Sequence, residues 1–203
     1  MTLETLGWSV RRQEEFAIHA MEGLSPGRVV GEHRSHYQVA TDASELTAGT
    51  TGRLRNTAAQ RSDLPGVGDF VAIRLAAGDG QATIEIVLPR TSALIRKAAG
   101  EPRPQLLAAN IDVVFIVTAP GGDFNLPRME RYLALVSESG ATPVIVVNKT
   151  DLANDVVGPT GRIAGLLLVC QFMQSARGLT MALVISSNIS RATGLWPLLV
   201  RRA

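Results

Sequence analysis

Residues 144–152 read "VIVVNKTDL", and this stretch decides the fold class of the second half of the chain. Four consecutive apolar residues are typical of a strand that is buried on both faces of a parallel sheet. Asn148, Lys149, Thr150 and Asp151 follow directly, so polar side chains come where that strand ends. Open α/β sheets bind their ligands at the carboxyl ends of their strands. The stretch therefore predicts an α/β domain with a binding loop at residues 148–151.

These four polar residues have the chemistry of a guanine-binding loop. An ionised Asp151 can accept hydrogen bonds from both the N1–H and the exocyclic amine of guanine, whereas adenine would leave the buried carboxylate unpaired. Asn148 can bond the O6/N7 edge of the base or tie the loop to its neighbours, and the Lys149 stem can lie over the ring. The alternative is a plain strand–turn–helix junction in which Thr150 or Asp151 is the N-cap.

The residues before this loop predict a strand–helix–strand unit. "NIDVVFIVTAP" (110–120) has the pattern of a buried strand, and "NLPRMERYLALVSESGA" (125–141) that of an amphipathic helix. The apolar side of the predicted helix contains Met129, Tyr132, Leu133 and Val136. Two continuous apolar strands joined by a helix form the βαβ unit of a parallel sheet.

The first half of the chain has a different pattern. Residues 4–23 predict a short helix, and five short strands with turn residues between them follow at 27–33, 36–41, 48–55, 68–75 and 82–90. Five strands of this length fit a small closed β-barrel, for which the OB-fold is the common solution. Another small barrel or a sandwich is the alternative. Residues 91–105 are polar and contain proline, which predicts a connector.

Composition limits the remaining classes of function. The chain has 203 residues, 46% of them hydrophobic, and a formal net charge of +2. It has one cysteine and three scattered histidines, so no metal-ligand spacing is present. The N-terminus lacks the pattern of a signal peptide, and the longest apolar stretch is too short to span a bilayer. We expect a cytoplasmic protein.

Several basic residues of the first half could contact RNA phosphates: Arg28, Arg53, Arg55, Arg90, Arg96, Lys97 and Arg103. A solvated barrel surface would use the same residue types, so this alternative stays open. The string "DLPG" (63–66) resembles a nucleotide-binding motif, but the residues before it are polar rather than a buried strand. We interpret it as turn chemistry.

A phosphate-binding loop of the form G-x-x-x-x-G-K-[ST] is missing, because the sequence contains no Gly-Lys pair. The tail is also unusual in composition. The 48 residues after Asp155 (203 − 155) contain no Asp, Glu or Lys, and their five charged residues are all arginine. Ordinary domains mix both signs of charge.

Several strings together resemble the RsgA (YjeQ/EngC) family of GTPases that depend on the small ribosomal subunit. They are "PGRVV", "GRLR", "DLPGVGDFVAI", "VLPRTSALIRKAAG", "QLLAANIDVVFIV" and "DFNLPRMERYLALVSESGATPVIVVNKTDL". The resemblance covers roughly residues 5–155. It implies an OB-fold barrel followed by a circularly permuted α/β P-loop GTPase domain, which is incomplete here, and a C-terminal zinc domain.

The resemblance also implies ligands and partners. The family binds GTP or GDP with Mg²⁺, hydrolyses GTP on the 30S subunit, and helps the late maturation of that subunit. By this resemblance Asn148, Lys149 and Asp151 bind guanine, and the partners are the 30S subunit and its 16S rRNA. Zinc has no ligands in this sequence. We expect a monomer that does not contact membranes.

The tail departs from the family. If residues 169–177 and 194–203 are translated in a shifted frame, the permitted strings look like the strand before the family's Ser-Ala loop and the start of its phosphate loop. We therefore expect a frameshift between about Asp155 and Val169. The alternative is a genuine divergent tail that packs on the βαβ unit.

These expectations divide the chain into five parts. They are an N-terminal helical extension (1–26), the OB-fold barrel (27–90), a linker (91–105), a partial permuted GTPase domain (106–165) and an out-of-frame tail (166–203). No catalytic residue is assigned, and whether this chain is itself an enzyme stays open. Two rival functions are an OB-fold module that binds rRNA without nucleotide chemistry, and an inactive truncated product.

Overall fold

The computed structural model describes residues 2–76, 81–97, 104–119, 124–148 and 182–185. The chain divides into two compact units, residues 1–111 and residues 112–203, and each is described by itself. Among the described residues, no helix is long and apolar enough to cross a membrane.

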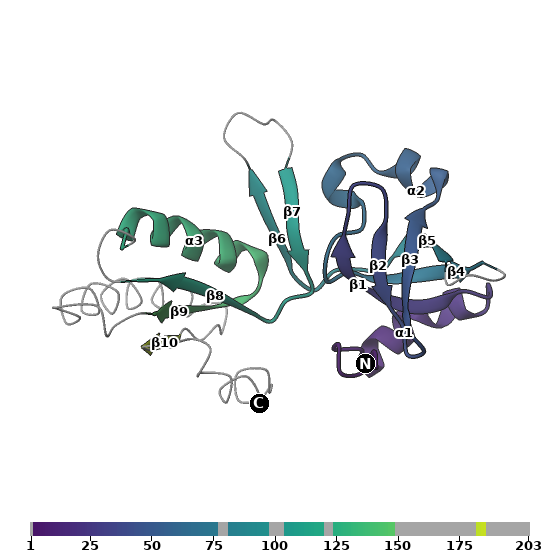
Figure 1. Cartoon of the computed structure of the whole chain (residues 1–203), viewed down its shortest axis with the longest axis horizontal. Coiled ribbons are helices and arrows are strands. Elements are labelled where there is room, and N and C mark those ends of the chain that lie inside the picture. Colours follow the sequence, from purple (N-terminus) through teal and green to yellow (C-terminus); the bar gives the residue numbers. More distant parts are fainter. Residues whose placement is uncertain (1, 77–80, 98–103, 120–123, 149–181, 186–203) are drawn as a thin grey trace. The chain divides into compact units, whose positions relative to one another are not determined.

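The first unit contains a closed barrel of five strands (Figure 1). They are β1 (Ser25–Glu32), β2 (Tyr37–Ala40), β3 (Glu45–Thr50), β4 (Phe70–Leu75) and β5 (Gln81–Val87). The strand order is β1-β2-β3-β5-β4, and the pairing of β1 with β4 closes the barrel. β3 and β5 run parallel, whereas the other pairs are antiparallel. This architecture confirms the predicted OB-like barrel.

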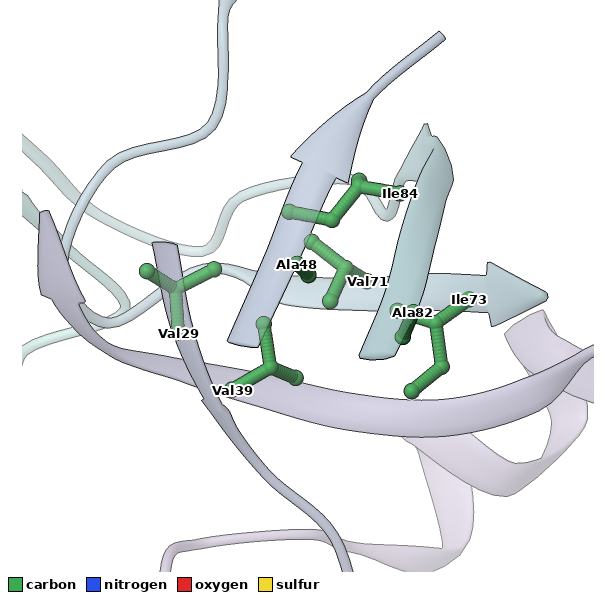
Figure 2. Close-up of a cluster of buried hydrophobic side chains, with 7 residues drawn as sticks. All are labelled: Val29, Val39, Ala48, Val71, Ile73, Ala82 and Ile84. Carbon is green, nitrogen blue, oxygen red and sulfur yellow. The ribbon is translucent and has the colours of Figure 1, made fainter. Parts of the chain in front are cut away.

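Alternating apolar side chains fill the barrel, as a small closed barrel requires. Figure 2 shows seven of these side chains converging from all five strands. They are Val29, Val39, Ala48, Val71, Ile73, Ala82 and Ile84, each less than a tenth exposed. β4 and β5 each supply two of these side chains, two positions apart, and the other three strands supply one each.

Helix α1 (Val10–Ala20) covers a second apolar cluster outside the barrel. Ser9 is its N-cap, and the Ser9 hydroxyl accepts a hydrogen bond from the backbone N–H of Arg12. Phe16 of α1 packs with Phe70 and Ala72 of β4 and with Leu88, which follows β5. The Trp8 ring lies edge-on to Phe16 and Phe70. The helix begins later than the predicted residue 4, because residues 3–7 form turns.

The predicted strand at 48–55 is correct only in its first part. β3 ends at Thr50, and helix α2 (Gly52–Thr57) follows, with the Thr51 hydroxyl accepting a hydrogen bond from the backbone N–H of Leu54. A threonine N-cap therefore changes the course of the chain where the β-branched residues suggested a longer strand. A short 3₁₀ helix, η1 (Arg61–Asp63), comes next.

Residues 91–105, expected as a connector, instead contain strand β6 (Ala93–Lys97) and the start of β7 (Pro104–Ala109). The two strands pair antiparallel, from Ala93 with Ala109 to Lys97 with Pro104. Pro104 takes the first position of its strand, which proline tolerates because no earlier ladder bond is lost. The hairpin belongs to the first unit.

The second unit contains the predicted strand–helix–strand. β8 (Val113–Thr118) and β9 (Thr142–Val147) pair in parallel, and α3 (Leu126–Ser139) connects them. Asn125 is the N-cap of α3, and Gly140, with φ of 86°, ends the helix in the left-handed conformation that glycine adopts without strain. Met129, Leu133 and Val136 are buried as predicted, but Tyr132 is 46% exposed, so its place on the apolar side was wrong.

A third strand, β10 (Ala182–Ile185), pairs in parallel with β9, which makes the order of this sheet β10-β9-β8. Its four residues lie inside the tail, 166–203, that we expected to be out of frame. A strand here is what the alternative, a genuine tail that packs on the βαβ unit, would produce. The other residues of the tail lie outside the described ranges.

Candidate functional site

The predicted guanine-binding loop begins at the carboxyl edge of the β8–β9 pair. Asn148 follows β9, and its backbone N–H donates a 2.9 Å hydrogen bond to the carbonyl oxygen of Thr118 at the end of β8. This bond extends the ladder by one residue and fixes the start of the loop. Lys149, Thr150 and Asp151 lie outside the described residues, so their assignment to guanine stays a prediction.

The Asn148 side chain carries an unusual feature. Its Oδ1 atom is buried, and no described residue donates a hydrogen bond to it. A buried acceptor without a donor costs about 1–3 kcal/mol, so this position calls for a donor from a ligand or from the neighbouring loop. An acceptor at the end of a parallel strand fits the predicted role of Asn148.

The described residues offer no candidate metal site. Within the described ranges, no three His, Cys, Asp or Glu side chains come together in a way that could hold a metal ion. No described residue is therefore assigned to zinc or to Mg²⁺.

The arginines predicted to contact RNA divide into two groups. Arg28 faces inward: its guanidinium donates to the backbone oxygens of Gly68 (3.2 Å), Asn110 (3.0 Å) and Leu6, and lies 4.9 Å from the Phe70 ring centroid. A guanidinium with three carbonyl acceptors and an aromatic neighbour is a structural element of the first unit.

Arg90 also faces inward. Its Nε and Nη2 atoms bind the two carboxylate oxygens of Asp69 at 2.8 and 2.7 Å, and the Asp69 side chain is completely buried. The same guanidinium donates to the carbonyl oxygens of Ser62 (2.6 Å) and Leu64 (2.9 Å). Arg90 thus ties η1 and the segment after it to the barrel.

The second group is available to solvent. Arg53 and Arg55 lie exposed on α2, and Arg96 lies exposed on β6. Arg55 donates a 2.6 Å hydrogen bond to the Thr50 hydroxyl, which holds its side chain beside the end of β3. The Lys97 side chain and Arg103 lie outside the described residues.

The structure adds a groove that the sequence did not reveal. A hollow of about 910 Å³ opens on the first unit between the β1–β2 turn, α2, η1 and β7. Four segments that are distant in the sequence form it, so no local pattern could have identified it. Its charged and aromatic lining residues are Glu32, His33, Arg34, Tyr37, Arg55 and Arg61.

The groove is positively charged. Its lining contains three arginines and one glutamate, a balance of +2 with histidine neutral. Arg61 lies 3.8 Å from the Glu32 carboxylate, both at the groove. Burial raises the pKa of Tyr37 above its usual value of 10, with Glu32 adding to the shift, so the phenol stays neutral at physiological pH. An aromatic, cationic groove suits nucleic acid.

Arg90 does not line the groove, but it holds one of the groove's walls in place. Leu64, Pro65 and Gly66 line the groove, and Asp69 accepts a 2.9 Å hydrogen bond from the Gly66 N–H. A Cβ on Gly66 would lie 2.6 Å from the Leu106 Cδ2 of β7, so glycine permits the close approach of the hairpin. Arg90 and Asp69 therefore position this wall.

Comparison with known proteins identifies the family. Residues 87–176 match a family model described as "RsgA GTPase". A "Small ribosomal subunit biogenesis GTPase RsgA" from Opitutus terrae is 44% identical over 172 residues, which cover 80% of this chain and 47% of that protein. An "RsgA 2" of the same description from Lactiplantibacillus plantarum is 35% identical over 208 residues, covering 95% and 59%. The chain spans about half the length of the curated relatives it matches.

The last alignment bears on the tail. Coverage of 95% leaves about ten of the 203 residues unmatched, so the alignment extends past residue 190. This extent favours a tail read in the same frame as the rest of the chain. The frameshift stays a prediction that DNA sequence can test.

Solved structures agree on the fold. The crystal structure of YloQ, described as a circularly permuted GTPase, superposes with a TM-score of 0.56 at 19% identity, covering 86% of this chain and 56% of that one. YjeQ from Thermotoga maritima gives a TM-score of 0.51 at 22% identity, covering 86% and 55%. The predicted order, an OB-like barrel and then part of a permuted GTPase domain, is thereby confirmed. By its sequence the chain belongs to the RsgA family, and the solved structures agree with it in fold.

Proposed function

We propose that this chain acts in maturation of the small ribosomal subunit, with a guanine-nucleotide site at the carboxyl edge of β9 and an rRNA-binding surface on the barrel. The names of the relatives support a role in biogenesis of the small ribosomal subunit. The chemistry of the two sites supports nucleotide binding at one and RNA binding at the other. The proposal includes a cytoplasmic location, which the relatives' role in biogenesis of the ribosomal subunit supports, and a monomeric state.

The buried Oδ1 atom of Asn148, without a donor among the described residues, is the observation that carries the nucleotide part. It stands one residue beyond a buried parallel strand and directly before Lys149, Thr150 and Asp151. The carboxylate of Asp151 would select guanine by accepting from two adjacent donors, and Asn148 would contact the other edge of the base or hold the loop.

Hydrolysis is a separate question. Phosphoryl transfer depends on backbone amides, a lysine and Mg²⁺ around the β- and γ-phosphates, and the sequence has no Gly-Lys pair to begin such a cradle. We therefore expect very weak guanine-nucleotide affinity and no meaningful GTPase activity from this polypeptide.

A titration with fluorescent GDP tests the nucleotide site, with fluorescent ADP as the control. Weak binding that favours GDP and disappears in Asp151→Asn supports the site, because the amide cannot accept both guanine donors. Equal binding of GDP and ADP contradicts it. Micromolar or tighter GDP binding contradicts the expected weakness, and would require a phosphate-binding element other than a G-x-x-x-x-G-K-[ST] loop.

The groove supports a second function, an OB-fold module that binds rRNA without nucleotide chemistry. Co-sedimentation with purified 30S subunits, without nucleotide and at several salt concentrations, tests this function, with 50S subunits as the control. Salt-dependent association with 30S alone is the expected result, since phosphate contacts release counterions. An inactive product would sediment with neither subunit.

The reading frame can be checked directly. If the DNA beyond codon 150 encodes GK[ST], D-x-x-G and zinc ligands in a shifted frame, the parent is a full permuted GTPase and the tail is an artefact. If no such frame follows, the tail is genuine, as β10 and the extent of the alignments favour.

A further inference from the structure

We propose that the groove between the β1–β2 turn, α2, η1 and β7 holds unpaired nucleotides of RNA rather than a duplex, with Tyr37 as the stacking platform and Arg55 as a phosphate contact. This inference rests on the proposed rRNA-binding function and narrows it to one conformation of the nucleic acid. It is carried by the shape, the charge and the aromatic content of the groove.

The shape of the groove suits an unpaired base. The groove encloses about 910 Å³ between four segments of the first unit. Duplex RNA presents its phosphates along a broad convex surface, whereas an unpaired base can leave the stack and enter a concave site. A hollow whose walls rise from the β1–β2 turn and from α2 therefore fits an extruded base better than a continuous helix.

Two residues with aromatic rings, Tyr37 and His33, line the groove. Tyr37 lies on β2, half-buried, and packs against the barrel core while also lining the groove. Its ring is held by strand pairing and by core packing, so it is ordered before any base arrives. His33, exposed on the β1–β2 turn, stacks on His36 at 4.6 Å between ring centroids, and His33 also lines the groove. Rings that hold unpaired bases are typically of these types.

Cations are arranged around these rings. Arg34, Arg55 and Arg61 come from the turn, from α2 and from η1, so positive charge surrounds the groove rather than gathering at one point. The hydrogen bond from the Arg55 Nε to the Thr50 hydroxyl fixes the stem of the side chain, and within the described ranges neither Nη group donates to another residue. A backbone that passes through the groove would meet an arginine on each side.

The neighbouring Arg53 supplies a matched control. It is exposed on the same helix as Arg55 but is not among the groove-lining residues. A general electrostatic attraction would make the two arginines equivalent, whereas binding in the groove requires Arg55. Tyr37→Phe gives the second control, since it keeps the ring and removes the hydroxyl.

Fluorescence anisotropy of the full chain tests the proposal, with a labelled 10-mer of single-stranded RNA, a duplex of the same sequence, and a poly-glutamate peptide as competitor. The single strand should bind at least about fivefold more tightly than the duplex. Tyr37→Leu should weaken single-strand binding about 5- to 150-fold, the range for loss of one base–aromatic stack, while Tyr37→Phe and Arg53→Gln stay within about twofold of the parent.

The salt dependence provides a readout that does not depend on the Tyr37 variant folding. Arg55→Gln should lower the slope of log affinity against log salt by about 0.7 for the single strand. Equal affinity for duplex and single strand, or equal effects of Arg53→Gln and Arg55→Gln, overturns the proposal. Displacement of RNA by the acidic peptide at equal charge also overturns it, since the groove would then select charge alone.

The 30S experiment separates failure of this inference from failure of the proposed function. If 30S binding persists in Tyr37→Leu and Arg55→Gln with parental affinity, the groove is not the contact, although the rRNA-binding function stands. If the parent chain does not bind 30S subunits at all, both proposals fail.

Discussion

Asp69→Asn should be among the most destabilising single substitutions in the first unit. The Asp69 side chain is fully buried and meets Arg90 through two hydrogen bonds of 2.7 and 2.8 Å. The amide would keep one acceptor but lose the negative charge. The Arg90 side chain, which is only 19% exposed, would then lack its counter-ion. Removing one partner of a buried pair costs about 3–5 kcal/mol.

The lower end of that range applies here, because Arg90 keeps its bonds to the Ser62 and Leu64 carbonyls and the amide oxygen can still accept from an N–H. We expect a loss of about 3 kcal/mol in the free energy of unfolding. For a unit of 111 residues this corresponds to a fall in melting temperature of about 12 °C or more.

Urea denaturation followed by Trp8 fluorescence measures this loss. Trp8 packs against Phe16 and Phe70 of the first unit, and a Trp196→Phe background removes the other tryptophan of the chain. In a double-mutant cycle with Arg90→Met, the double variant should be more stable than the sum of the two single losses by about 2 kcal/mol. A loss below about 1 kcal/mol in Asp69→Asn, or a coupling near zero, would refute the reasoning.

Three further predictions concern the first unit. Gly68→Ala should prevent folding or cost more than about 3 kcal/mol, because Gly68 has φ of +93° and its added Cβ would lie 2.0 Å from the Ala109 carbonyl oxygen of β7. Circular dichroism melts check this, and Gly49→Ala is the control because an added Cβ at Gly49 has no neighbour within 4 Å. Arg28→Gln should lower the melting temperature, whereas Arg55→Gln should lower only affinity for the 30S subunit; calorimetry and co-sedimentation separate the two. Burial raises the pKa of Glu15, but hydrogen bonds from two neighbouring arginines outweigh it and lower that pKa below 4.5 overall. The stabilisation by Glu15 is therefore present above pH 4.5 and lost as the pH falls through its folded pKa, and Glu15→Gln should flatten stability against pH in that acid range.

The elements with a strong period were predictable from the sequence. The apolar runs of β8 and β9 and the helical spacing of α3 leave few alternatives, because buried parallel strands lack the polar alternation of an exposed sheet. The five barrel strands could be predicted from short runs separated by turn residues, although β3 ends at Thr50 and not at the predicted Arg55 because Thr51 is the N-cap of α2.

The remaining features depend on contacts distant in the sequence. β6 and β7 contain two large apolar residues each but are short and lie in a stretch with several charged residues and prolines, so their pairing into a hairpin was not apparent from the local pattern. Arg28 and Arg55 look alike in the sequence, yet one is surrounded by carbonyl oxygens and the other faces the groove. The groove itself exists only when four separate segments have come together, so no local pattern could predict it.

The contact between the first helix and the last residues of the first unit has a consequence for synthesis. Arg12, 3% exposed, donates a 2.8 Å hydrogen bond to the Asn110 side chain, 98 positions later. Asn110 has φ of 53°, and its Oδ1 also accepts from the Thr91 N–H at 2.9 Å. A nascent chain that has formed α1 therefore cannot complete the burial of Arg12 until residue 110 has left the ribosome.

Domains generally fold as units during synthesis, and here the first helix is completed by nearly the last residue of its unit. A ribosome-arrest series should show the unit becoming resistant to protease abruptly, once Asn110 has emerged, rather than in steps as each strand appears. We expect the first unit to reach its final stability in this late step, because a chain interrupted before residue 110 lacks the side-chain acceptor of Arg12.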